Sequence, residues 1–504
     1  MIVSRAKSLL LVFFIAAILL LCAVLKIAVV DGPEYALQAA SQQSSQMKIK
    51  TYRGAIFDRQ LRPLVDARSY ILALTDDKGV KNIEDAVTSG EEYVRFNITK
   101  RYDERNLARH IIGYVDGECK GVSGLEQLYD GVLYSDISYT INDFNNVFDQ
   151  PIPRFGRSVL NPLYENKRNL KLTLDYHIQK IVEQAADGCE TNSAIVVLDT
   201  DTFDVLASCS RPNFDQNNVE QYLNAGGSEL VNRAMAEYDA GSIFKIITAA
   251  CALENGIALP NDPFWCGGRS NFDGQIFQCH EEEGHGVIPF FDAFAKSCNC
   301  CFYDLGILSG KAELERMAKR FGMGRPVLDI PGEAAGSISL SDKTTRSDMA
   351  NAAIGQGDIL ITPLQAAKIA AVIACGGYEK EVNLVDAVVD ETGVGIASER
   401  RTGEQQIVSA ETAAQIQEMM RRTVTNGTGW QANSPVVEIA GKTGTAETGW
   451  LKDGQPMVHG WFVGYFPYSQ PKYAAAVFLE DGKSGAVAAG IFRKIAEEVM
   501  ALDY

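Results

Sequence analysis

Histidine is scarce in this chain of 504 residues, which contains only five. A catalytic centre built on several histidines is therefore not expected, although one histidine is enough for catalysis. The sequence also lacks long basic runs, and its net charge is −17, so nucleic acid is not an expected partner. It lacks internal repeats and low-complexity tracts as well. The length predicts two or three globular domains with a sizeable core.

Long hydrophobic runs are also lacking, with one exception near the N-terminus. Leu9 to Val30 is apolar apart from Lys26, and its 22 residues suffice to cross a bilayer. Basic residues precede the run and acidic residues follow it, which predicts a cytoplasmic N-terminus too short for a signalling domain. A cleaved signal peptide is the alternative. The length of the run and the lack of a clear small-x-small cleavage site favour a retained anchor.

Cysteine is not scarce, since the chain has eleven. Cys22 lies in the apolar run, and ten would lie outside the membrane. Export usually accompanies disulfides, but the adjacent Cys300 and Cys301 fit a disulfide framework poorly. A host that lives without oxygen would explain free exported thiols.

The pattern Ser-x-x-Lys occurs four times, but only one occurrence has the surroundings of a nucleophile. The four pairs are Ser4–Lys7, Ser45–Lys48, Ser242–Lys245 and Ser469–Lys472. Ser242 follows a glycine and opens an apolar stretch that ends at Asn255-Gly256, which predicts a buried helix. In its first turn, free backbone N–H groups and the helix dipole favour an oxyanion near Ser242. Lys245 lies on the same helix face, and burial lowers its basicity so that it can accept the serine proton.

Two further motifs follow in order along the chain. Ser297-Cys298-Asn299 lies downstream of the helix, and Lys442-Thr443-Gly444-Thr445 lies on an expected strand. Together with Ser242 they supply a nucleophile, a base and a cationic cradle for a substrate. An ordinary N-cap serine beside a surface lysine is the structural alternative for an isolated Ser-x-x-Lys pair.

The expected architecture of the second part of the chain is one antiparallel sheet assembled from both ends of a domain, with a mostly helical insert between them. A hairpin comes first and three strands with an amphipathic helix come last. The segments are Ser193–Thr200, Val205–Ser210, Val437–Ala446, Trp461–Phe466, Tyr473–Glu480 and the helix 490–502. The cleft between sheet and helices is where the motifs can meet.

The region before this domain reads as an extended α+β module of short strands, such as Ser69–Leu74, and glycine turns. No catalytic constellation is evident in it, so a spacer is the simplest interpretation. Arg53, Asp58, Arg59 and Glu126 form either a buried ion network at its junction or solvated charges.

The ordered motifs resemble those of bacterial class B penicillin-binding proteins, which are membrane-anchored D,D-transpeptidases. The resemblance covers nearly the whole chain. Supporting motifs are Arg53-Gly54-x-Ile56-x-Asp58-Arg59, Gly121-x-x-Gly124-x-Glu126, Asn232-Arg233-Ala234, Gly355-Gln356-Gly357, Thr362-Pro363-Leu364-Gln365 and Gly427-Thr428-Gly429. It implies an α+β fold, with a penicillin-binding/β-lactamase-like transpeptidase domain, an extended N-terminal pedestal and one transmembrane helix. The expected parts are a cytoplasmic tail at 1–7, an anchor at 8–30, the pedestal at 31–170 and the transpeptidase domain at 171–504.

The resemblance implies a serine acyl-enzyme. Ser242 would attack the penultimate D-Ala of a peptidoglycan stem peptide and release the terminal D-Ala, and an amine of a neighbouring stem would then form the cross-link. Lys245 would be the base, although the sequence does not decide which lysine acts. Ser297 would relay protons to the leaving amine, Asn299 would hold the substrate amide and Lys245, and Lys442 would keep the cleft positive and assist Ser297.

The substrate cradle and the partners are implied in the same way. Thr443, Gly444 and Thr445 would bind the substrate, its carboxylate being held by the two threonines, and the backbone N–H groups of Ser242 and Thr445 would form the oxyanion hole. β-Lactams would acylate Ser242. The module before the domain is too short for a glycosyltransferase, which implies a separate membrane glycosyltransferase of the shape-elongation-division-sporulation type. The chemistry needs no cofactor.

A possible metal site involves Cys266, Cys279, His285 and Cys298. Three thiolates and an imidazole make a closed zinc shell, and some class B relatives carry zinc beside the active site. The zinc would pin the loop that carries Ser297. A disulfide such as Cys279 with Cys298, or free buried thiols, are the alternatives. His280 is assigned to the surface.

Two other functions remain alternatives on the same fold. One is a β-lactamase or D,D-carboxypeptidase, which needs a positioned base for deacylation, and no glutamate after Asn299 lies in a pattern of that kind. The other is a non-catalytic β-lactam-binding scaffold, which the intact motifs disfavour. Roles in elongation, division and sporulation are equally compatible with the sequence.

Overall fold

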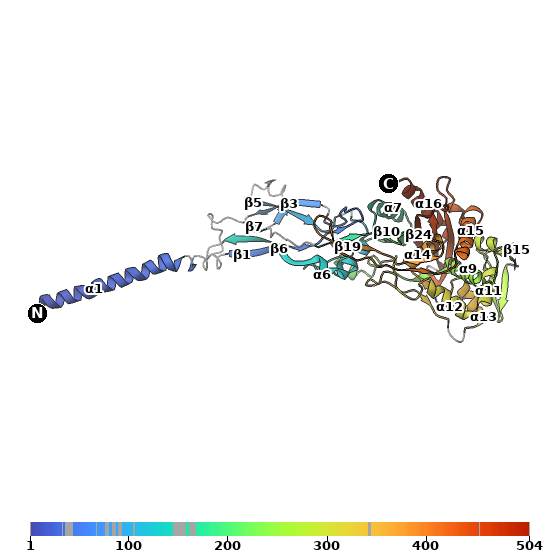
Figure 1. Ribbon diagram of the computed structural model, residues 1–504, viewed down its shortest axis with the longest axis horizontal. Coiled ribbons are helices and arrows are strands. Elements are labelled where there is room, and N and C mark those ends of the chain that lie inside the picture. Colours follow the sequence, from blue (N-terminus) through green and yellow to red (C-terminus); the bar gives the residue numbers. More distant parts are fainter. Residues whose placement is uncertain are drawn as a thin grey trace. The chain divides into compact units, whose positions relative to one another are not determined.

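The computed structural model describes residues 2–32, 34–35, 44–66, 68–75, 80–82, 87–88, 93–103, 106–144, 158–160, 168–340, 344–452 and 454–502. The chain separates into two compact units (Figure 1). The smaller unit comprises Met1–Arg53, Ser69–Thr99 and Ser135–Glu165, and the larger comprises Gly54–Arg68, Lys100–Tyr134 and Asn166–Tyr504. Two stretches from the module expected at 31–170 thus pack within the larger unit.

The smaller unit begins with the apolar helix that the sequence predicts. Helix α1 (Ile2–Leu25) continues as a π-helix over Lys26–Val30, and the stretch Arg5–Val30 is long and apolar enough to cross a membrane. Two three-stranded sheets follow, in the orders β1-β6-β7 and β4-β3-β5. Their strands are β1 (Ser44–Arg53), β3 (Arg68–Thr75), β4 (Val80–Asn82), β5 (Tyr93–Lys100), β6 (Tyr134–Phe144) and β7 (Ser158–Leu160).

The centre of the larger unit is a five-stranded antiparallel sheet in the order β10-β9-β24-β23-β22. Its strands are β9 (Ser193–Asp199), β10 (Val205–Arg211), β22 (Ala440–Lys452), β23 (Gln455–Phe466) and β24 (Tyr473–Leu479). The prediction of one sheet built from both ends of the domain is confirmed, because β9 pairs with β24. Strand β22 pairs only with β23 in this sheet and forms its edge.

Apolar side chains cover both faces of this sheet, which explains the continuous apolar runs in its strands. Helices α7 (Tyr176–Asp187) and α16 (Gly485–Met500) pack on one face, where Ile195 and Val197 meet Phe492. The opposite face packs on the helical insert, including α14 (Pro363–Ala374).

The helical insert packs around α9 (Lys245–Glu254), which is buried from Lys245 to Ala252 and which the 3-10 helix η2 (Gly241–Phe244) precedes. Burial on every side explains why this helix lacks a polar face. The other helices of the insert are α8 (Glu220–Leu223), α10 (Phe290–Ala295), α11 (Asn299–Ser309), α12 (Lys311–Arg320), α13 (Arg346–Ala353), α15 (Ala410–Asn426) and the 3-10 helix η3 (Trp430–Ala432).

Short strands complete the larger unit. A four-stranded sheet has the order β2-β8-β19-β20, and the hairpins β12–β15 and β13–β14 lie between α9 and α10 in sequence. The bounds are β2 (Ile56–Phe57), β8 (Asn169–Leu172), β11 (Tyr238–Asp239), β12 (Pro263–Cys266), β13 (Arg269–Phe272), β14 (Gln275–Gln278), β15 (Gly286–Pro289), β16 (Ser337–Ile338), β17 (Ile359–Ile361), β18 (Tyr378–Lys380), β19 (Val385–Val389), β20 (Gly395–Ser398) and β21 (Glu404–Gln406). Three short helices lie between β2 and β8 in sequence: α4 (Arg109–Ile112), α5 (Gly124–Leu128) and α6 (Asp130–Leu133).

Of the four charged residues proposed to form a junction network, Arg53, Asp58 and Glu126 are buried, and Asp58 and Glu126 belong to the larger unit. Asp58 accepts hydrogen bonds from the backbone of Gln60 and Arg62, and Glu126 binds Arg101 with Nε–Oε1 at 2.7 Å. Arg59 is exposed. Arg101, which the sequence patterns did not single out, is therefore the cation that neutralises Glu126.

Candidate active site

A cavity of about 580 Å³ opens beside the edge strand β22. Ser242, Ser297, Asn299, Thr443 and Thr445 all line it, so the three motifs meet in one cleft although 203 positions separate the first from the last (445 minus 242). The two predicted lysines lie beneath this lining, completely buried. The structure thus brings together all five residues predicted to be catalytic and the predicted substrate cradle.

Glycines allow Ser242 to lie directly against β22. Gly241 has φ +53°, and a Cβ there would lie 2.8 Å from the carbonyl oxygen of Thr445. On the strand side, a Cβ at Gly444 would lie 2.9 Å from the side chain of Ile243. Contacts this short are not tolerated, so both positions need glycine for η2 to approach the strand.

Lys245 reaches from α9 into the second motif. Its Nζ donates to the backbone oxygen of Ser297 at 2.7 Å, to Ser297 Oγ at 3.1 Å and to Asn299 Oδ1 at 2.7 Å. The same ammonium lies 5.3 Å from the centroid of the Phe302 ring. Every donor of this buried group therefore has an acceptor, as a buried cation requires.

Lys442 approaches the same hydroxyl from the sheet. Its Nζ donates to Ser297 Oγ at 2.9 Å and to the backbone oxygen of Thr443 at 3.0 Å. Ser297 Oγ therefore accepts from both lysines, and its own hydrogen is free to point into the cleft. This arrangement makes Ser297 a suitable donor to a ligand atom in the cavity.

Burial changes the acidity of both lysines. Desolvation lowers the pKa of Lys245 from 10.5 to about 8. Desolvation and the charge of Lys245 hold the pKa of Lys442 well below its ordinary value. Both shifts favour the neutral amine, which is the form able to accept a proton.

Ser297 itself has an unusual backbone. Its φ is +55°, in the left-handed region that residues other than glycine seldom adopt. It sits in the short turn between α10 and α11, where its N–H donates to Phe294 O at 3.0 Å and Cys298 N–H donates to Ala293 O at 2.8 Å. Residues held in such backbone conformations are common at functional sites.

The edge of the cleft contains contacts that sequence patterns did not reveal. Thr428 and Thr443 share a hydrogen bond of 2.6 Å between hydroxyls. The backbone oxygen of Gln278 accepts from Asn299 Nδ2 at 3.2 Å and from Tyr303 OH at 3.0 Å. This carbonyl ties the β13–β14 hairpin to the second motif. A backbone acceptor of this kind cannot be predicted from a local sequence pattern.

His280 is exposed, as predicted, but it also lines the cleft. The sequence did not predict this position, which arises because the connection between β14 and β15 borders the cleft. The ring centroids of His280 and His285 are 5.3 Å apart.

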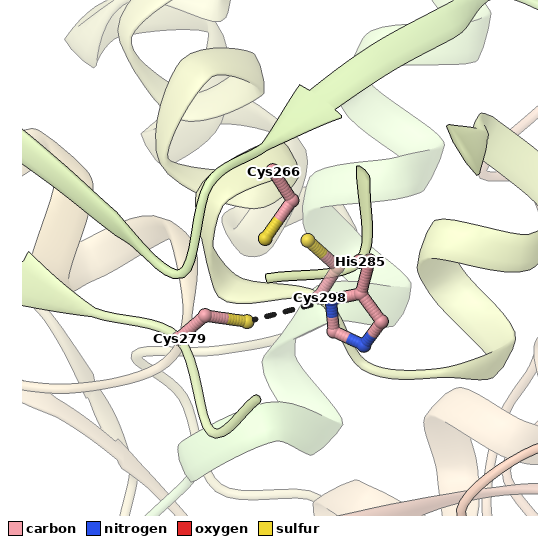
Figure 2. Close-up of side chains that lie close together, drawn as sticks. All are labelled: Cys266, Cys279, His285 and Cys298. Atoms are coloured by element: carbon pink, nitrogen blue, oxygen red, sulfur yellow. Dashed lines mark hydrogen bonds between the residues drawn. The ribbon is translucent and has the colours of Figure 1, made fainter. Parts of the chain in front are cut away.

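The four residues proposed as metal ligands cluster in the structure, with their ligand atoms all within 4.8 Å of one another (Figure 2). Cys266 ends β12, Cys279 follows β14, His285 precedes β15, and Cys298 caps α11. The cysteines are buried and His285 is partly buried, with Cys279 Sγ 3.7 Å from His285 Nδ1. Three sulfurs and one imidazole nitrogen are a donor set suited to tetrahedral zinc.

The thiols in this cluster interact strongly with one another. Hydrogen bonds from Cys298 and Cys300 lower the pKa of Cys279, and the same bonds, with burial, raise the pKa values of Cys298 and Cys300. Cys300, which sequence reasoning did not include, also contacts Cys266. A divalent cation would allow several of these thiols to be thiolates at once, so the residues fit zinc.

Residues 193–497, which run from β9 into α16, match the family model of the penicillin binding protein transpeptidase domain. The chain belongs to this family. The matched residues include all three motifs of the cleft. The family assignment therefore covers the residues whose geometry is described above.

Individual relatives agree with the family assignment. Stage V sporulation protein D of Bacillus subtilis is 29% identical over 427 residues, which are 80% of this chain and 64% of that protein. The peptidoglycan D,D-transpeptidase PbpA of Mycolicibacterium smegmatis is 33% identical over 353 residues, covering 64% of this chain and 71% of PbpA. The imipenem acyl-enzyme complex of penicillin-binding protein A from M. tuberculosis has a TM-score of 0.68 at 25% identity, covering 89% of this chain and 99% of that one. This chain thus spans less than two thirds of the length of the sporulation protein.

Proposed function

We propose that this penicillin-binding protein is a serine D,D-transpeptidase that cross-links peptidoglycan stem peptides and is inhibited by β-lactams. The observation that carries the proposal is the convergence of Lys245, Lys442 and Asn299 around Ser297 in a cleft that Ser242 lines. The named activity of PbpA and the imipenem acyl-enzyme of penicillin-binding protein A support it.

In the first half-reaction, neutral Lys245 takes the hydroxyl proton of Ser242 while Ser242 Oγ attacks the carbonyl carbon of the penultimate D-Ala. Backbone N–H groups of Ser242 and Thr445 hold the developing oxyanion. The peptide C–N bond then breaks, and the leaving amine of the terminal D-Ala receives a proton through Ser297, which Lys245 or Lys442 replenishes. The product is an ester on Ser242 and free D-Ala.

In the second half-reaction, an amine of a neighbouring stem attacks the ester carbon. The amine loses a proton to the lysine–serine relay, a new amide bond forms, and the C–O bond to Ser242 breaks with return of a proton to Oγ. Asn299 and the edge of β22 orient the donor amide, and Thr443 and Thr445 bind its carboxylate before D-Ala departs. Positioning, proton transfer and stabilisation of the oxyanion all contribute to the rate.

The test is covalent labelling with a fluorescent penicillin. Wild-type protein should give a label that survives for hours, while Ser242→Ala should give none, because the ester cannot form. Ser469→Ala is the matched control, since Ser469 opens another Ser-x-x-Lys pair but is exposed. Label on Ser242→Ala would contradict the assignment of the nucleophile. Rapid loss of wild-type label would instead support a β-lactamase or carboxypeptidase.

We also infer that Cys266, Cys279, His285 and Cys298 hold a structural zinc ion. Bound there, zinc would cross-link the two hairpins to the start of α11 and so fix the turn that carries Ser297 and Asn299. The catalytic steps do not pass through the metal.

The membrane arrangement and partner are further parts of the proposal. The helix over Arg5–Val30 would anchor the protein with its N-terminus in the cytoplasm, which protease treatment of intact protoplasts tests. A separate membrane glycosyltransferase of the shape-elongation-division-sporulation type would supply the glycan strands. The family resemblance supports this partner, and co-purification from detergent-solubilised membranes tests it.

A further inference from the structure

Among the residues that the structure describes, the lining of the cleft has one formally charged side chain, which is Glu447. The remaining lining residues carry hydroxyls, amides or apolar groups, apart from the imidazole of His280. Glu447 is exposed and has no ion-pair partner among the residues that the structure describes. A solitary carboxylate in a peptide-binding cleft attracts a cation on the ligand and repels an anion there.

Strand geometry places Glu447 in line with the substrate cradle. Thr443, Thr445 and Glu447 alternate along β22 and all line the cavity, whereas Ala446 between them is buried. Because β22 is the edge of its sheet, its outer backbone groups can pair with an extended peptide. Two residues of a strand span about 7 Å, so Glu447 lies roughly that far beyond Thr445.

The spacing of Thr443, Thr445 and Glu447 along β22 places them beside different parts of a bound stem peptide. In the proposed reaction, Ser242 and Thr445 would lie at the bond that reacts, and Thr443 would lie toward the leaving D-Ala with its carboxylate. Glu447 lies in the other direction along the strand, toward the residues that precede the two D-Ala units. A side chain there that ends in an ammonium group would meet the carboxylate of Glu447.

We propose that Glu447 determines donor specificity by binding a protonated primary amine on the diamino-acid residue that precedes D-Ala-D-Ala. The inference rests on the proposed transpeptidase function. The acceptor stem carries an amine of the same chemistry, but the alignment of Glu447 with Thr443 and Thr445 favours the donor.

The experiment compares two penicillins that carry a lysine-derived acyl side chain with a blocked α-amine. One has a free ε-amine, and the other has that amine acetylated. The ratio of their acylation rate constants on the full chain at low salt should be about two to five in favour of the free amine, the effect of one exposed ion pair. The ratio should fall toward one in high salt.

Variants identify the residue responsible. Glu447→Gln should bring the ratio to about one, and Glu447→Lys should invert it. Glu190→Gln is the control, because it makes the same change in net charge at an exposed position between α7 and β9 and should keep the wild-type ratio. An unchanged ratio in Glu447→Gln, or a wild-type ratio of one, would overturn the inference.

The outcomes also separate this inference from the proposed function and from the acceptor. Failure of both penicillins to acylate the wild type would reject the proposed function itself. If Glu447→Gln leaves the acylation ratio intact but slows attack of a free lysine amine on the preformed acyl-enzyme, Glu447 serves the acceptor and the donor assignment is wrong.

Discussion

Ser297 is the residue that contacts both buried lysines of the site, Lys245 and Lys442. Its hydroxyl accepts from two buried lysines, and its left-handed backbone holds that hydroxyl at the floor of the cavity. Two ammonium groups bridged by one oxygen repel each other, so the pair releases a proton more easily than either lysine would alone. The relay therefore starts from a state in which a neutral amine is accessible near neutral pH.

The depressed pKa of Lys245 predicts how acylation depends on pH. The base form is neutral, and its pKa in the folded protein is about 8 instead of 10.5. The acylation rate constant should therefore rise about tenfold per pH unit below that value and level off above it. Measurement with a fluorescent penicillin between about pH 6 and pH 9 checks this, within the range where the fold persists by circular dichroism.

Two lysine variants sharpen this prediction. Lys245→Arg should lower the plateau by about a hundredfold or more, because arginine does not deprotonate. Lys442→Arg should retain a pH midpoint set by Lys245. If the midpoint disappears in Lys442→Arg and survives in Lys245→Arg, Lys442 is the base.

Individual site residues differed in how far the sequence revealed them. Ser242, Lys245 and Lys442 lie in short motifs with fixed spacing, so their meeting in one cleft was predictable. Thr428 lies in one of the supporting motifs, but its hydrogen bond to Thr443 was not predicted. Cys300 and the Gln278 carbonyl belong to no motif and take part only through contacts made in the folded chain. Glu447 has no motif role, and only the alternation of β22 in three dimensions brings it into the cleft.

At the scale of elements, the close approach of η2 to β22 is the contact that assembles the site. Gly444→Ala would place a methyl group 2.9 Å from both Ile243 Cγ2 and Trp461 Cβ. Displacement of Ser242 by even about 1 Å should slow acylation by roughly a hundredfold. Stopped-flow labelling checks the rate, and Gly131→Ala in α6 is the control, since no atom lies within 4 Å of its added Cβ.

The two hairpins before α10 are the elements that depend on the metal. Purified protein should contain about one zinc per chain by elemental analysis. Cys298→Ser should lose the zinc and lower Tm by roughly 5 °C or more, because metal binding stabilises only the folded state. Cys251→Ser, which changes a buried thiol on α9, should retain it. A metal-free wild-type protein with full penicillin labelling would exclude the zinc proposal.

Element boundaries were predicted best where burial sets them. The hairpin of β9 and β10 lies where the sequence placed it, because its apolar runs are buried on both sides of the sheet. Strand β22 begins at Ala440 instead of the predicted Val437, and both β22 and β23 extend beyond the prediction toward the turn that joins them, where Trp450 and Leu451 are exposed. Backbone pairing continues there without burial, so no hydrophobic pattern marks it.

At the scale of the whole molecule, fold class and sheet assembly followed from the sequence, whereas the division into units did not. The stretches 54–68 and 100–134 belong to the larger unit although they lie within a module that reads as continuous. Their membership depends on tertiary pairings such as the parallel contact of β2 with β8, which leave no local signal.

The sheet that joins β9 to β24 also determines when the protein becomes reactive. Ser242 is synthesised long before Lys442, and its surroundings remain incomplete until β22 and β23 have formed beside η2. A translation product that stops before residue 440 therefore carries the hydroxyl but not the strand that orients and activates its target. Chains that lack β22 are therefore expected to react neither with substrate nor with a β-lactam, whereas chains that contain the whole sheet react with both.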